Sequence, residues 1–241
     1  MMVLISIWGC CFLASIVQAC CGSGYAMIVT ALLPLFIPFS DAVVISCISS
    51  LFGNVLLILK YRQYICFKVI LLPTIICIGV TAWLVTVSTG ISDTVMKRLY
   101  GTLLILIAVI FFFWGKYIHL NSSARTAIFV GGCVGFTNGL FAVGGPFMSF
   151  YLLSFLEDKE MFIGTIQAFF LICGLSGLFS RIASGMVTTS LLKLSAVSLL
   201  AICCGQPIGT QILRHLSFQS LKKVVYGFIA AMGIYLVFFT A

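Results

Sequence analysis

Two clusters of helix-breaking residues lie inside long apolar stretches of the chain. The first is Gly-Ser-Gly at 22–24, and the second is Gly-Gly-Pro at 144–146. Glycine and proline both destabilise the interior of a helix, so we expect each stretch to break at its cluster. A helix that restarts after such a break presents unpaired N–H groups and the positive end of its dipole, which suits a small anion.

The polar side chains near these breaks are amides and hydroxyls rather than acids. Gln18 and Asn138 precede the two breaks at similar places. The structural alternative is that hydroxyls bond to their own helix and amides join neighbouring helices. Arg181, at the end of an apolar stretch, either faces inward or extends to the membrane surface. The candidate anion-binding residues are Gly22, Ser23, Gly24, Ser49, Asn54, Asn138, Gly144, Gly145, Gln167 and Arg181.

Catalytic and metal-binding patterns are missing from the sequence. No acid falls in the middle of an apolar stretch: Asp41 is expected at a helix N-cap or in a helix first turn, and Glu157, Asp158 and Glu160 are expected to cluster in a loop. Neither a Ser-His-Asp, H-E-x-x-H or Walker A pattern nor a dinucleotide-binding pattern occurs. We therefore expect neither an enzyme nor an ATP-driven pump, and we expect no cofactor.

The eleven cysteines lie mostly in apolar runs and lack metal-ligand spacing. Free buried cysteine packs as a small hydrophobe, and we assign that role to most of them. The alternative is a permease for soft metals or thiol compounds, in which Cys20, Cys21, Cys203 and Cys204 would bind the substrate.

The composition indicates whether water or lipid surrounds the protein. Of 241 residues, 62% are apolar and 7% are charged, against about 25% charged in a soluble domain. This excludes a soluble enzyme and a nucleic-acid-binding domain. The apolar runs are continuous rather than alternating, so we expect a multi-pass all-α protein in the lipid bilayer instead of a β-barrel. The net charge of +8 is then explained by basic loops.

Eight apolar segments follow from the positions of the charges. They are 2–37, 42–59, 69–91, 99–115, 126–156, 162–180, 187–213 and 224–241. As single helices, residues 2–37 would span roughly 54 Å and residues 126–156 roughly 46 Å, whereas the bilayer core is about 30 Å thick. Both segments contain a glycine cluster, so each is predicted to form a V or two crossings.

The chain also repeats itself. KRLYG at 97–101 returns as KVVYG at 223–227, and Gly24 and Gly53 correspond to Gly144 and Gly174. We therefore predict two membrane repeats, 1–121 and 122–241.

Charge favours inverted rather than parallel repeats. Parallel repeats would divide the Lys and Arg residues seven to six between the two faces, whereas inverted repeats divide them nine to four. A bias of that kind marks the cytoplasmic side of a membrane protein. The face with four would hold Lys97, Arg98, Arg181 and Lys193.

Several stretches resemble the sulfite exporter TauE/SafE family of permeases. They are GSGYAMIVTALLPLF at 22–36, DAVVISCISSLFGNVLLILKYR at 41–62, GFTNGLFAVGGPFMSFYLL at 135–153 and FIGTIQAFFLICGLSGL at 162–178. Ile163 stands where the family often carries Arg, so amides and backbone N–H groups would have to recognise the anion. The resemblance implies permeation of sulfite or short organosulfonates without ATP.

We therefore predict a secondary transporter of the cytoplasmic (inner) membrane, with a midplane site between the breaks and alternating access of the two repeats. Its expected partners are a small anionic substrate and lipid, with no nucleic acid. A homodimer is one of the oligomeric states left open. An inside-negative potential would favour export of an anion, and the substrate could itself carry a proton.

Overall fold

The computed structural model describes residues 2–114, 123–156, 158–212 and 234–238, and these residues contain helices and no strand. The helices are α1 (Met2–Cys21), α2 (Tyr25–Leu32), α3 (Phe39–Tyr61), α4 (Phe67–Ser88), α5 (Asp93–Trp114), α6 (Ala124–Phe141), α7 (Gly145–Leu153), α8 (Lys159–Ala183) and α9 (Thr189–Ile212). Short 3-10 turns follow α2 at Leu33–Leu35 and α3 at Arg62–Tyr64. The predicted all-α class is confirmed.

Five of the described helices are long and apolar enough to cross a membrane. They are the helical segments Met2–Cys21, Phe39–Tyr64, Phe67–Ser88, Lys159–Ala183 and Thr189–Ile212. The chain is therefore a multi-pass membrane protein. Most of the last predicted segment, 224–241, lies outside the described residues.

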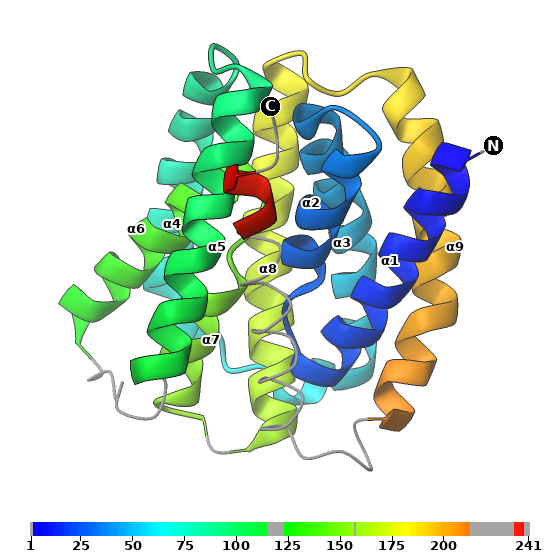
Figure 1. Ribbon diagram of the computed structural model, residues 1–241. Helices are drawn as coiled ribbons and strands as arrows, with labels where there is room; N and C mark the ends of the chain where they lie inside the picture. Colours follow the sequence, from blue (N-terminus) through cyan, green and yellow to red (C-terminus); the bar gives the residue numbers. More distant parts are fainter. Residues whose placement is uncertain (1, 115–122, 157, 213–233, 239–241) are drawn as a thin grey trace.

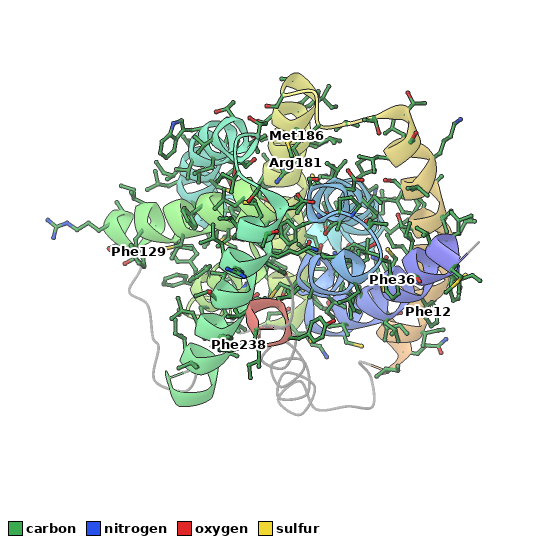
Figure 2. All side chains as sticks on the ribbon, turned by 45° about the horizontal axis from the view of Figure 1, so that its top comes forward. Phe12, Phe36, Phe129, Arg181, Met186 and Phe238 are labelled. Atoms are coloured by element: carbon green, nitrogen blue, oxygen red, sulfur yellow. The ribbon has the colours of Figure 1, made fainter. Side chains whose placement is uncertain are left out.

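Large apolar side chains cover the outside of the helical bundle. Trp83 is 66% exposed, Phe129 70% and Phe179 69%, and Figure 2 places Phe129 at the outer edge of the molecule. So large an exposed apolar surface is unfavourable in water but favourable in contact with lipid chains.

The first long segment breaks where it was predicted to break. α1 ends at Cys21, and Gly22 and Gly24 have φ values of 71° and 107°. Because a side chain is disfavoured at positive φ, glycine is the residue that allows the chain to leave α1 and begin α2 within a few residues.

The second long segment breaks two residues earlier than the Gly-Gly-Pro cluster indicates. Ala142 adopts a left-handed conformation with φ 57° and ends α6. The N–H groups of Ala142 and Val143 donate to the carbonyls of Asn138 and Thr137 at 3.0 and 3.4 Å. The bond from the left-handed residue to the carbonyl four residues earlier is that of an αL cap. The cluster itself begins α7, with Pro146 in its first turn, where proline loses no helical hydrogen bond.

The two broken segments enter the bundle from opposite ends. In Figure 1, α1 starts at the upper end, beside the N-terminus, and α2 leads back to that end. α6 starts at the lower end, where α5 finishes, and α7 returns there. Each V thus opens toward a different end. The complete inverted repeat stays a prediction, because most of the last segment falls outside the described residues.

The helix packing joins the two predicted repeats. The most extensive contacts are between α4 and α6 and between α1 and α9, followed by α3 against α8. Glycines allow the first of these pairs to pack closely: a Cβ at Gly131 would lie 2.7 Å from the Pro73 carbonyl oxygen, and one at Gly135 would lie 2.7 Å from the Val80 Cβ. Small residues spaced by four are typical of close helix pairs in membranes.

Acidic side chains at the ends of the bundle cap helices. The Asp93 carboxylate accepts from the N–H groups of Phe39 and Ser40 at 2.9 and 3.2 Å, which satisfies donors at the start of α3. Asp158 caps α8, and Glu160 lies in the first turn of that helix rather than in the expected loop; Glu157 lies outside the described residues. Asp41 lies in the first turn of α3, as predicted. These acids serve the ends of helices, where they complement the helix dipole.

Candidate functional site

The two helix breaks meet inside the bundle. The Ser149 hydroxyl, on α7, donates to the Ser23 hydroxyl at 3.1 Å. A Cβ built on Gly145 would lie 3.3 Å from the Ser23 Cβ and 3.6 Å from the Gly24 nitrogen. Glycine at position 145 therefore allows the two breaks to approach each other closely, because a side chain there would fill part of the space between them.

A cavity of about 50 Å³ lies at this junction and is lined by residues of both breaks. They include Ser23, Gly24, Gly144 and Gly145. On the same kind of measure a single water needs about 10–15 Å³, so the cavity has room for a few waters or a small oxyanion.

The first turn of α2 forms one wall of the cavity. Tyr25, Ala26 and Met27 line it, directly after Gly24. The first N–H groups of a helix lack partners within that helix, and they form the positive end of its dipole. This wall can therefore donate hydrogen bonds to an anion.

Amides from three helices form further walls. Gln18 of α1, Asn54 of α3 and Asn138 of α6 all line the cavity, and all three are at least nine-tenths buried. Phe169 and Phe170 of α8 supply apolar surface. No Asp or Glu is among the described residues that line the cavity.

Gln18 and Asn54 form a buried pair. Gln18 Nε2 donates to Asn54 Oδ1 at 2.8 Å, and Gln18 Oε1 has no hydrogen-bond partner. Beside the pair, Gln206 Nε2 donates to the carbonyl of Gly53 at 2.9 Å. The Gln206 amide thus joins α9 to α3.

Asn138 is held by α4 and α8. Its Nδ2 donates to Thr81 Oγ1 at 3.2 Å and to the carbonyl of Cys173 at 3.3 Å. Its own backbone carbonyl accepts from Arg181, whose Nη2 also donates to the Gly139 carbonyl, both at 2.9 Å. Arg181 therefore binds the C-terminal carbonyls of α6, where a cation is favoured by the helix dipole.

Arg181 is buried, with 1% of its surface exposed, and Figure 2 shows it near the upper end of α8. Its hydrogen bonds go to the three backbone carbonyls of Gly177, Asn138 and Gly139, and no described acid forms a salt bridge with it. It does not line the cavity, but Asn138 and Cys47, which do, both contact it. The positive charge therefore lies directly behind the cavity wall.

The structure brings six of the ten candidate residues to the cavity lining and leaves four outside it. The six are Ser23, Gly24, Asn54, Asn138, Gly144 and Gly145. Outside the lining, Gln167 Nε2 donates to the Gly22 carbonyl at 2.7 Å, and Ser49 donates to the Ile45 carbonyl of its own helix. Gln167 and Arg181 thus have parallel positions, since each binds carbonyls at the end of the helix that precedes a break.

The candidate set does not contain several residues of the lining. Gln18 is the most polar of these, and its place before the first break matches that of Asn138 before the second. Cys47, Cys173 and Phe169 also reach the cavity. Nothing in an apolar run distinguishes their faces from those that contact lipid, so only the packing of α3 against α8 identifies them.

The described cysteines are all free thiols. Of the four that the thiol alternative assigns to a substrate, none lines the cavity: Cys20 bonds the Gly209 carbonyl, and Cys203 and Cys204 are exposed at the surface. Within the described ranges, no group of three or more His, Cys, Asp or Glu residues could hold a metal ion.

A multi-pass helical protein in which two broken helices meet around a cavity lined in part by amides has the architecture of a membrane transporter. The chain belongs to the Sulfite exporter TauE/SafE family, whose sequence profile matches residues 7–236. This is a family of permeases for sulfite and related sulfur-containing anions. No curated protein and no solved structure gives a significant match to the chain.

Proposed function

We propose that this protein is a secondary transporter that exports small sulfur-containing anions, either sulfite or short organosulfonates, across the cytoplasmic membrane. The observation that carries the proposal is the cavity at the junction of the two helix breaks. It is lined by the first turn of α2 and by amides, and none of its described lining residues is an acid. The first N–H groups of α2 and the Asn54 amide nitrogen can donate hydrogen bonds to an anion there, and no fixed negative charge of the described lining repels it.

Arg181 supports the preference for an anion. Its charge is bonded to carbonyls rather than to an acid, and it contacts Asn138 and Cys47, which both line the cavity. In a medium of low dielectric, a cation attracts an anion over a distance of several ångströms. The positive charge attracts an anion without contacting it, so the bound anion can still leave.

The mechanism that we propose is alternating access. The cavity lies between one broken segment from each predicted repeat, and the V formed by each segment opens toward a different end of the bundle. Rocking one repeat against the other would open the cavity first to one side and then to the other. Contacts that join the repeats, such as Ser149 to Ser23, would change during the cycle.

The membrane potential would favour export. Moving one negative charge out of an inside-negative cell releases about 2.3 kcal/mol per 100 mV. Since no acid lines the cavity among the described residues, the proposed export needs no titrating carboxylate.

The proposal is tested with purified protein in liposomes loaded with sulfite or with a short alkylsulfonate. Under an imposed inside-negative potential, these anions should leave liposomes that contain the protein faster than protein-free liposomes. Sulfate and chloride should leave the same protein-containing liposomes more slowly. Equal release with and without the protein for every sulfur-containing anion would refute the proposed function.

Permeation of thiol compounds or soft metals is the second candidate, and Cys47 and Cys173 in the cavity lining favour it. Thiol groups can bind soft metals. Replacing both residues by serine should leave sulfite release unchanged if the anion proposal is right. Loss of transport in this variant, together with transport of a thiol or soft metal by the native protein, would favour the second candidate.

A further inference from the structure

Asn138 faces the cavity with an acceptor. Both hydrogens of its amide are used, one on Thr81 Oγ1 and one on the Cys173 carbonyl. The bond to a backbone carbonyl fixes which amide atom is the nitrogen, because a carbonyl can only accept. Asn138 is 8% exposed and lines the cavity, so Oδ1 is the polar atom of its side chain that remains for a ligand.

Ser50 contributes a second acceptor to the lining. Its hydroxyl hydrogen is donated to the carbonyl of Cys47 in its own helix at 2.9 Å. The lone pairs of its oxygen are then what Ser50 can offer to a ligand. Two residues of the lining therefore lack a hydrogen to give to an anion.

Asn54 faces the same cavity with a donor. Its Oδ1 accepts from Gln18 Nε2, which leaves Nδ2 for a ligand. The neighbouring Gln206 supports this orientation: its Nε2 is fixed as a donor by the Gly53 carbonyl. Gln18 Oε1 and Gln206 Nε2 approach the same position, since a Cβ on Gly53 would lie 2.9 Å from the oxygen and 3.0 Å from the nitrogen. The oxygen of the Gln18 amide is therefore favoured beside the Gln206 NH₂ group, which leaves the Gln18 nitrogen to donate to Asn54 Oδ1.

We infer that the cavity selects a monoanion that carries its own hydroxyl hydrogen, hydrogensulfite in its O–H form, over the sulfite dianion and over sulfonates. This inference rests on the proposed function and names the protonation state of its substrate. The hydroxyl of the ligand donates to Asn138 Oδ1, while the charged oxygens accept from Asn54 Nδ2 and from the first turn of α2. A dianion has no hydrogen for Asn138 and would place a negative oxygen against this acceptor.

With this arrangement a proton is exported on the substrate itself, so no side chain has to titrate during transport. A transporter that accepts only the protonated anion moves one proton with each substrate. This agrees with the lack of an acid among the described residues of the lining.

The test compares sulfite with methanesulfonate by calorimetric titration of the detergent-solubilised full chain across the pH range in which sulfite loses its second proton. Methanesulfonate replaces the hydroxyl by a methyl group of similar size and stays a monoanion throughout. The apparent affinity for sulfite should fall about tenfold per pH unit once the dianion predominates, because only the protonated fraction binds. The affinity for methanesulfonate should not change with pH and should be at least about tenfold weaker than that for hydrogensulfite, since it leaves Asn138 Oδ1 unpaired.

Two variants locate the preference within the cavity. Asn138→Ala should weaken binding of sulfite at low pH and bring the ratio of the two affinities close to one, because the acceptor is lost for both ligands. Asn54→Ala should weaken both ligands by a similar factor and preserve their ratio, because both accept from Nδ2. If Asn138→Ala is not monodisperse, the titration of the native protein decides alone.

The outcomes separate this inference from the function on which it rests. Equal affinity for both ligands at every pH, or an affinity for sulfite that rises with pH, would overturn the inference and leave the anion transporter intact. Failure of both ligands to bind at any pH would overturn the proposed function, and with it the inference.

Discussion

The Ser149 hydroxyl donates to the Ser23 hydroxyl at 3.1 Å and so links the two broken segments of the fold. Ser149 lies in α7, and Ser23 lies in the break between α1 and α2. The bond spans the predicted repeats beside the cavity. It is therefore a sensitive place to ask whether the breaks separate during transport.

A disulfide at this position should stop transport. The double variant Ser23→Cys/Ser149→Cys, treated with a mild oxidant, should release sulfite from liposomes at a rate near that of protein-free liposomes, because the cross-link holds the breaks together. Reduction should restore the rate. Ser23→Cys alone, under the same oxidant, controls for the native cysteines, and unimpaired transport by the cross-linked protein would show that the breaks do not move apart.

Adding a methyl group should destabilise the packing of α4 against α6 at Gly135 but not at Gly132. A Cβ on Gly135 would lie 2.7 Å from the Val80 Cβ, whereas one on Gly132 meets nothing within 4 Å. Gly135→Ala should lower the free energy of unfolding by about 1–3 kcal/mol through overpacking. Gly132→Ala should raise it by about 0.5–1 kcal/mol through helix propensity. Denaturant unfolding in detergent measures both, and equal effects would contradict the close helix contact.

Relief of the left-handed conformation at residue 142 should stabilise the protein. Ala142 has φ 57°, whereas the matching place in the first break is Gly22 with φ 71°. Ala142→Gly should raise the free energy of unfolding by about 1 kcal/mol, because glycine adopts this conformation without the cost that a Cβ carries. Thermal unfolding measures the shift, with Ala142→Val as the opposite case. A lower melting temperature for the glycine variant would contradict this reading of the break.

Removal of the buried Arg181 charge should affect both stability and transport. Arg181→Met leaves the carbonyls of Asn138 and Gly139 without the guanidinium, and a charged hydrogen-bonded group of this kind contributes about 2 kcal/mol. The sulfite release rate should fall as well, since the cation behind the cavity is lost. Arg181→Lys keeps the charge and should retain more of the transport rate than Arg181→Met. Equal rates in the two variants would show that the charge has no part in attracting the anion.

Prediction from the sequence is strongest where one local rule decides the structure. Continuous apolar runs identified the helices, and glycine at residues 22 and 24 marked the first break, because both features depend on the chain near them. The second break begins at Ala142, and no local rule predicts a left-handed alanine. Its conformation is stabilised by the cap to Asn138 and by the packing around it.

The candidate site was predicted only in part, since a cavity depends on which helix faces meet. Asn54 and Asn138 stand out in the sequence as amides in apolar surroundings, and they line the cavity. Gln167 stands out equally but binds the Gly22 carbonyl behind the wall. In the stretch 135–153, Gly135 and Gly139 serve the packing of α6 on α4, while Gly144 and Gly145 line the cavity.

The most direct test of the account is the initial rate of labelled sulfite release from liposomes that contain the native protein, Asn54→Ala or Thr74→Val. Asn54 lines the cavity, whereas Thr74 is a buried polar residue that bonds within its own helix and does not line it. With all three proteins folded, the account predicts a rate at least about tenfold lower for Asn54→Ala and a rate near the native one for Thr74→Val. A native rate in Asn54→Ala would contradict the claim that the anion passes through the cavity between the two helix breaks.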